Sequence, residues 1–203
     1  MSNCDCSIEA ETRAQSRVLI ALLAINGSMF GIEIVTGILA ESTGLIADSL
    51  DMLADAVVYG IGLYAVGRAA GVKVRAAFAS GLFQIVLALI VALDIGRRAL
   101  FGSDPEPTYM VTVGIVALVA NVICLALLAK HRDGEVHMRA SWIFSKNDVI
   151  ANVGVISGGW LVYVLDVRWP DLIVGIAIST IVFRGGLAII ADARQEHARS
   201  AIN

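Results

Sequence analysis

The sequence predicts an all-α membrane protein with six transmembrane helices and with both termini in the cytoplasm. Of the 203 residues, 58% are hydrophobic and only 16% are charged, against about 25% charged residues in an ordinary soluble domain. The mean hydropathy is +0.79. A soluble chain of this size cannot hide so much apolar surface in one core. The composition therefore excludes a soluble enzyme, a disordered chain and a fibrous repeat.

Six apolar stretches follow one another, each near the roughly 20 residues that a transmembrane helix needs. In chain order they cover residues 18–39, 45–66, 76–96, 110–129, 143–165 and 172–190. Polar breaks separate them; Pro105 and Pro107 mark a loop, and Pro170 marks the start of a helix. We therefore expect a cytoplasmic tail over residues 1–16, a six-helix transmembrane domain over 17–191 and a short cytoplasmic tail over 192–203.

The distribution of Lys and Arg predicts the orientation, because cytoplasmic loops carry the excess of positive charge. Ten of these residues fall on the side of the two termini: Arg13, Arg17, Arg68, Lys73, Arg75, Lys130, Arg132, Arg139, Arg194 and Arg199. The other side holds Arg97, Arg98 and Arg168. The polar, partly acidic start does not resemble a cleavable signal peptide. A net charge of −3 also argues against nucleic acid as a partner.

Three aspartates interrupt the second apolar stretch, which reads LIADSLDMLADAVVYG. At 100° per residue, Asp48, Asp51 and Asp55 share a helix face about 60° wide. Each aspartate at mid-bilayer costs roughly 2.5–3.5 kcal/mol on insertion scales, and neighbouring carboxylates repel one another. A bound divalent cation relieves both penalties. The alternative for Asp48 is a helix-end carboxylate satisfied by water or by N-terminal amides.

The fifth apolar stretch begins IFSKNDVIANVGV and supplies a second set of oxygen atoms. Asp148 and Asn152 are four residues apart and share a face, with Phe144 one turn earlier on the same stripe. Asn147 is adjacent to Asp148 in the sequence but is rotated by about 100°. These residues predict that the fifth helix contributes to the same polar site as the second.

Asp148 would complete an oxygen-rich site with Asp51 and Asp55, suited to a borderline or hard divalent cation. The alternative for Asp148 is an ion pair with Lys146 or Arg184 that holds two helices together. Both interpretations remain open on the sequence alone.

Weaker polar signals lie in the first and fourth stretches. Asn26 and Glu33 are seven residues apart and so share a face, and Asn121 interrupts the fourth stretch. Each is a candidate for ion coordination, hydration or an interhelical hydrogen bond; for Asn121, packing is the favoured interpretation.

Two segments outside the apolar stretches are candidates for peripheral metal capture. Cys4 and Cys6 lie in the N-terminal tail, and His131 and His137 lie in the fourth loop. A solvated loop is the favoured interpretation of the two histidines. With Cys124 the cysteine count is odd, which predicts no disulfide framework.

The segment GLIADSLDMLAD, the aspartate of the fifth stretch with NVGV after it, and the Pro170-Asp171 pair resemble the cation diffusion facilitator family. The resemblance extends from Arg17 to Ile190. It implies a dimeric exchanger that moves Zn²⁺ or a related divalent cation out of the cytoplasm against protons. The family's usual cytoplasmic domain after the sixth helix is not expected here.

By position, the resemblance assigns the two metal ligands of the second helix to Asp51 and Asp55. The His-x-x-x-Asp motif of the fifth helix falls on Phe144 and Asp148, so one ligand of the usual set is missing. The loss of an imidazole favours oxygen-preferring ions, and Mn²⁺, Fe²⁺ or Co²⁺ become candidates beside Zn²⁺. Candidates to replace the missing ligand are Asn147, Asn152 and a water molecule.

The main alternative is an Mg²⁺-dependent membrane enzyme resembling the CDP-alcohol phosphotransferases. Their signature has Asp-Gly, then Ala-Arg, then Gly-x-x-x-Asp-x-x-x-Asp, and only Asp51-x-x-x-Asp55 matches it. Asp48 is followed by Ser49, and the second stretch contains no Lys or Arg to hold a phosphate. A haem anchor would need histidines inside the apolar stretches, where there are none. A cation channel remains open.

We therefore predict a secondary active transporter, not an enzyme, that exports divalent cations in exchange for protons through an intramembrane carboxylate site. Zn²⁺ is the first candidate, followed by Co²⁺, Fe²⁺ and Mn²⁺. No cofactor is expected beyond the transported ion. The expected partners are the cations, protons, the lipid bilayer and a second copy of the chain. The expected location is the bacterial inner membrane, crossed several times.

Overall fold

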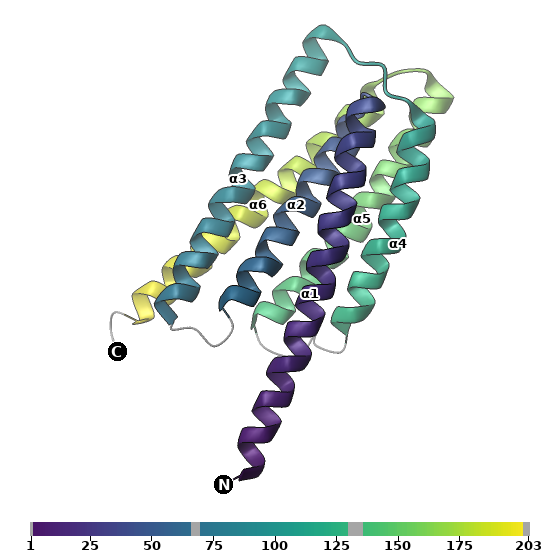
Figure 1. Cartoon of the computed structure of the whole chain (residues 1–203). Coiled ribbons are helices and arrows are strands. Elements are labelled where there is room, and N and C mark those ends of the chain that lie inside the picture. Colours follow the sequence, from purple (N-terminus) through teal and green to yellow (C-terminus); the bar gives the residue numbers. More distant parts are fainter. Residues whose placement is uncertain (1, 66–69, 130–135, 201–203) are drawn as a thin grey trace.

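The structure is a computed structural model that describes residues 2–65, 70–129 and 136–200. Every regular element in these ranges is an α-helix: α1 (Ser2–Leu39), α2 (Thr43–Ala65), α3 (Ala70–Phe101), α4 (Pro107–Ala129), α5 (Val136–Leu165) and α6 (Trp169–Ser200). The predicted all-α fold of six helices is confirmed. Successive helices run in opposite directions, so the start of α1 and the end of α6 lie at the same end of the bundle (Figure 1). We call this the terminal end and the opposite one the distal end.

Among the described residues, five helices are long and apolar enough to cross a membrane, namely α1, α3, α4, α5 and α6. The exception, α2, has 23 residues and carries three aspartates. It packs mainly against α1, α3 and α6, and Tyr64 is its one large apolar side chain that is exposed among those described. The other five helices expose many large apolar side chains. The chain is therefore an integral multi-pass membrane protein, with α2 as its interior helix.

Each helix begins before its predicted apolar stretch, and α3 and α6 also continue past the end of theirs. α1 begins at Ser2, α3 begins at Ala70 and α6 continues to Ser200, and the first turns of α1 stand clear of the bundle (Figure 1). An apolar stretch marks only the part of a helix that suits hydrocarbon. Helical hydrogen bonding continues outside it where the sequence is rich in good helix formers such as Ala, Glu, Arg and Gln.

The distal end contains short turns with well-defined stop signals. Glu41 follows α1 with φ 48°, Gly102 follows α3 with φ 93°, and Asp166 follows α5 with φ 51°. These left-handed conformations end each helix. Ser42 then caps α2, because its Oγ accepts a hydrogen bond from the backbone N–H of Leu45 at 3.1 Å.

Helices α3 and α6 form the most extensive pair in the bundle and lie side by side in Figure 1. Their contact depends on glycine. A Cβ atom added at Gly81 would lie 2.7 Å from the carbonyl oxygen of Gly186, and one added at Gly186 would lie 2.7 Å from the carbonyl oxygen of Gly81. Only a residue without a side chain allows the two backbones to approach this closely.

Gly81→Ala is therefore expected to destabilise the protein by about 1–3 kcal/mol, the range for overpacking a close contact. The measurement is the apparent melting temperature of the purified protein in detergent. Gly96→Ala is the matched control in the same helix, since an added Cβ there meets no atom within 4 Å. The control is expected to be neutral or slightly stabilising, because Ala is the better helix former. Equal melting temperatures for the two variants would contradict the proposed close contact.

Candidate metal site

The interior face of α2 carries the three aspartates predicted to share a stripe. Asp48 and Asp55 are buried, and Asp51 is half-buried. These carboxylates are shielded from lipid because other helices enclose α2. Their partners come from α1, α4 and α5 and form two groups of polar side chains.

The first group, which we call the Asp148 cluster, consists of Asn26, Asp55, Tyr59, Cys124 and Asp148. The carboxyl groups of Asp55 (α2) and Asp148 (α5) lie within hydrogen-bonding reach of each other. The Tyr59 hydroxyl donates to Asp55 Oδ2 at 3.1 Å. Asn26 (α1) donates to Cys124 Sγ (α4) at 3.7 Å, and Cys124 interacts electrostatically with Asp55. Four helices thus contribute to one buried polar centre.

The second group, the Glu33 cluster, consists of Glu33, Asp48, Asn121 and Asn152. Asn152 Nδ2 (α5) donates to Asp48 Oδ2 (α2) at 2.5 Å, and Asn121 Nδ2 (α4) donates to Asn152 Oδ1 at 2.9 Å. Glu33 (α1) is 0% exposed, and its electrostatic neighbours are Asp48 and Asp51. The same four helices, α1, α2, α4 and α5, therefore meet a second time.

Asp51 lies between the two clusters, since it interacts electrostatically with both Asp48 and Asp55. Asp148 in turn interacts with all three aspartates of α2. However, no three His, Cys, Asp or Glu side chains among the described residues converge closely enough to hold one metal ion. Asp51, Asp55 and Asp148 are neighbours in this conformation and do not form a closed coordination shell.

The two clusters are rich in acceptors and poor in donors. Neither Asp55 nor Asp148 forms an ion pair with a Lys or Arg among the described residues, and the alternative partners Lys146 and Arg184 are both exposed. Buried carboxylates without a cationic side chain must share protons or hold a cation, because an uncompensated charge is costly in a low dielectric. The arrangement is therefore chemically suited to a metal ion or protons.

Several other sequence predictions can now be located. The helix-end interpretation of Asp48 does not hold, because its partner is Asn152 on another helix. Asn121 was expected to be a packing residue, yet it makes an interhelical hydrogen bond. Asn147 is half-buried on α5. The side chains of Cys4, Cys6, Phe144, His131 and His137 lie outside those that the structure describes.

The role of Asp171 could not be predicted from the sequence; this residue lies in the first turn of α6 and is 0% exposed. Its carboxylate accepts hydrogen bonds from the Ser42 hydroxyl at 2.6 Å, from the Thr43 N–H at 2.6 Å and from the Gly44 N–H at 2.9 Å. It thereby fixes the start of α2, the helix that carries the three aspartates. More than 120 residues separate the partners, so no local spacing could have revealed the contact.

The sequence analysis also missed Tyr59, although its position four residues after Asp55 places both side chains on one helix face.

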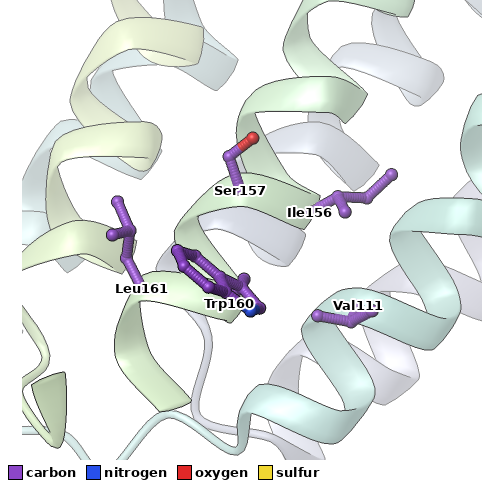
Figure 2. A pocket seen from close by; sticks show the side chains of 5 residues that line it. All are labelled: Val111, Ile156, Ser157, Trp160 and Leu161. Atoms are coloured by element: carbon purple, nitrogen blue, oxygen red, sulfur yellow. The ribbon is translucent and has the colours of Figure 1, made fainter. Parts of the chain in front are cut away.

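An apolar groove of about 480 Å³ lies between α4 and α5 and has no metal ligand in its lining. Its lining is Val111 from α4 and Ile156, Ser157, Trp160 and Leu161 from α5 (Figure 2). The polar interior, not this groove, is the candidate site.

Membrane-crossing helices that bury carboxylates facing one another are typical of proteins that move ions across the bilayer. The chain matches the family model described as the cation efflux transmembrane domain over residues 19–196. It therefore belongs to the cation efflux family, also called the cation diffusion facilitators, and the predicted resemblance is confirmed. No curated protein matches the chain. The family identifies the chain as a cation transporter and not an enzyme.

Proposed function

We propose that this protein exports a divalent metal cation in exchange for protons, with Asp51, Asp55 and Asp148 as the residues that bind the ion. The observation that supports this most is the contact of the buried Asp55 and Asp148 carboxyl groups across α2 and α5. Two carboxylates this close share a proton or a cation. Exchange between a proton-bound state and a cation-bound state of these carboxyl groups is the chemistry that an antiporter needs.

In this proposal the metal and the protons compete for the same oxygen atoms. Metal ligands must be deprotonated, so binding of the cation from the cytoplasm releases protons from the carboxyl groups. The site then opens toward the other side, where protons displace the metal. One or two protons enter for each divalent cation that leaves.

The energy available is sufficient for a modest gradient. One unit of pH difference supplies about 1.4 kcal/mol per proton, which sustains about a tenfold gradient of the metal. With one proton per cation, a net positive charge would leave against an inside-negative membrane potential, which costs about 2.3 kcal/mol at 100 mV. Exchange for two protons would be electrically neutral and would depend on the pH difference alone.

The family resemblance and the charge distribution support four further parts of the proposal. Zn²⁺ is the first candidate, with Co²⁺, Fe²⁺ and Mn²⁺ beside it. The working unit is a homodimer in the bacterial inner membrane. Both termini face the cytoplasm, because most Lys and Arg residues outside the apolar stretches fall on the side of the two termini. The domain over residues 17–191 performs the transport.

The function is tested by metal uptake into proteoliposomes with an imposed pH gradient, using Zn²⁺, Co²⁺, Mn²⁺ and Fe²⁺ in turn. Uptake should saturate with metal concentration and stop when an ionophore collapses the pH gradient. Flux that neither saturates nor depends on the gradient would favour a channel. No flux of any of the four metals would contradict the proposed transporter.

Phe144→His is expected to shift the selectivity toward Zn²⁺, because it restores an imidazole one turn before Asp148. The ratio of Zn²⁺ to Mn²⁺ uptake should rise by about tenfold relative to the wild type, which corresponds to about 1.4 kcal/mol. Phe144→Leu is the matched control, as it changes size without adding a ligand. An equal ratio for the two variants would contradict the assignment of this position to the ion site.

A further inference from the structure

Glu33 is the most unusual buried group outside the proposed transport site. Its side chain is 0% exposed, and neither carboxyl oxygen has a hydrogen-bond partner among the described residues. Its electrostatic neighbours are the acidic residues Asp48 and Asp51. A carboxyl group in this situation is unsatisfied in either protonation state, since a charged group lacks a counter-ion and a neutral one lacks an acceptor for its proton.

The Glu33 cluster contains a further unsatisfied acceptor. The side-chain oxygen Oδ1 of Asn121 is buried without a hydrogen-bond donor among the described residues. Asn121 uses its Nδ2 group to donate to Asn152. Its oxygen atom is therefore free to accept, and a cation satisfies several acceptors at once.

Asp48 is already oriented for such a role. Asn152 donates to its Oδ2, and Asn121 in turn holds Asn152. A donor on one carboxylate oxygen fixes the group and leaves the other oxygen available, which is the usual arrangement around a ligating carboxylate. Asp48 is 1% exposed, so this orientation is protected from competing water.

We propose that Glu33 and Asp48 form a second cation-binding position, separate from the Asp51, Asp55 and Asp148 site and closer to the distal end. It rests on the proposed function in that both positions would lie on one ion path. Glu33 precedes the distal end of α1 by few residues, and Asp48 follows the distal start of α2. An ion released from Asp55 and Asp148 would reach this position before leaving the bundle.

The atoms available to coordinate an ion determine which cation this position would bind. The position offers two carboxylates and amide oxygens but no imidazole among its members, and hard divalent cations such as Mn²⁺ prefer such oxygen ligands. Because no third carboxylate converges on Glu33 and Asp48 here, amide oxygens and water would fill the remaining places.

The test counts Mn²⁺ ions bound by the purified full chain in detergent, using the loss of the free Mn²⁺ signal in electron paramagnetic resonance. Glu33→Gln is expected to bind one ion fewer than the wild type and to keep the ion at the other site. Asp55→Asn is expected to lose the other ion and keep this one. Glu106→Gln, an exposed position, is the matched control and should bind like the wild type.

An unchanged number and affinity of ions in Glu33→Gln would overturn the second position. Unchanged binding in Asp55→Asn would instead count against the proposed transport site, so the two failures are distinguishable. If Glu33→Gln does not fold, Glu33→Asp keeps the charge and shortens the reach; it should weaken binding of one ion by about tenfold or more. Wild-type affinity in Glu33→Asp would also overturn the proposal.

Discussion

Asp55→Asn is expected to abolish proton-driven metal uptake, with the rate falling at least about a hundredfold to the level of empty vesicles. The substitution keeps the size of the side chain and its hydrogen bond from Tyr59. It removes the charge that faces Asp148 and with it a ligand that must be anionic to hold a divalent cation. The measurement is the initial rate of metal uptake into proteoliposomes under a fixed pH gradient.

The control for this variant is Asp166→Asn, which makes the same chemical change at an exposed residue after α5. Asp166 has φ 51°, a conformation that Asn also accepts readily, so the fold should be unaffected. Its uptake rate should equal that of the wild type. Wild-type flux in Asp55→Asn would rule out the proposed transport site. Equal loss in both variants would mean that net charge, not the site, sets the rate.

Asp171→Ala is expected to cause the largest loss of stability of any single substitution considered. It removes three hydrogen bonds to the start of α2 and leaves the buried N–H groups of Thr43 and Gly44 without an acceptor. Each such bond to a charged acceptor is worth about 1.5–3 kcal/mol, so the total should exceed about 3 kcal/mol. The apparent melting temperature in detergent should fall by on the order of 10 °C.

Two further variants separate the Asp171 contact from a general effect of charge. Asp192→Ala changes an exposed aspartate in the same helix and should alter stability by less than about 0.5 kcal/mol. Asp171→Asn keeps an acceptor oxygen and should fall between Asp171→Ala and the wild type. If Asp171→Ala melts at the temperature of Asp192→Ala, then α2 does not depend on this anchor.

The fold followed closely from hydropathy, because six apolar stretches of membrane length permit few other architectures. Even α2, whose aspartates lower its apolar character, was recognised from the length of the stretch between its breaks. The ends of the helices were less accessible to prediction. The first turns of α1 and the last turns of α6 are polar, and polar segments give no hydropathy signal whether or not they are helical.

The polar interior could be predicted in part. Helical periodicity assigned Asp48, Asp51 and Asp55 to one face of α2. It also assigned Asp148 and Asn152 to a shared face of α5. Periodicity could not show which helices face one another, so the hydrogen bonds of Asn152 with Asp48 and Asn121 emerged only from the packing. An amide in an apolar stretch gives the same sequence signal whether it packs against a neighbour or bonds to one.

The most direct test of the central claim follows the pH inside proteoliposomes, reported by an enclosed dye, when Zn²⁺ is added outside without an imposed gradient. If the ion exchanges for protons through Asp51, Asp55 and Asp148, the interior of wild-type vesicles should become alkaline in step with metal uptake. Asp55→Asn vesicles should show neither change, and Asp166→Asn vesicles should show both. Metal uptake without any change of internal pH, or an equal pH change in Asp55→Asn, would contradict the account.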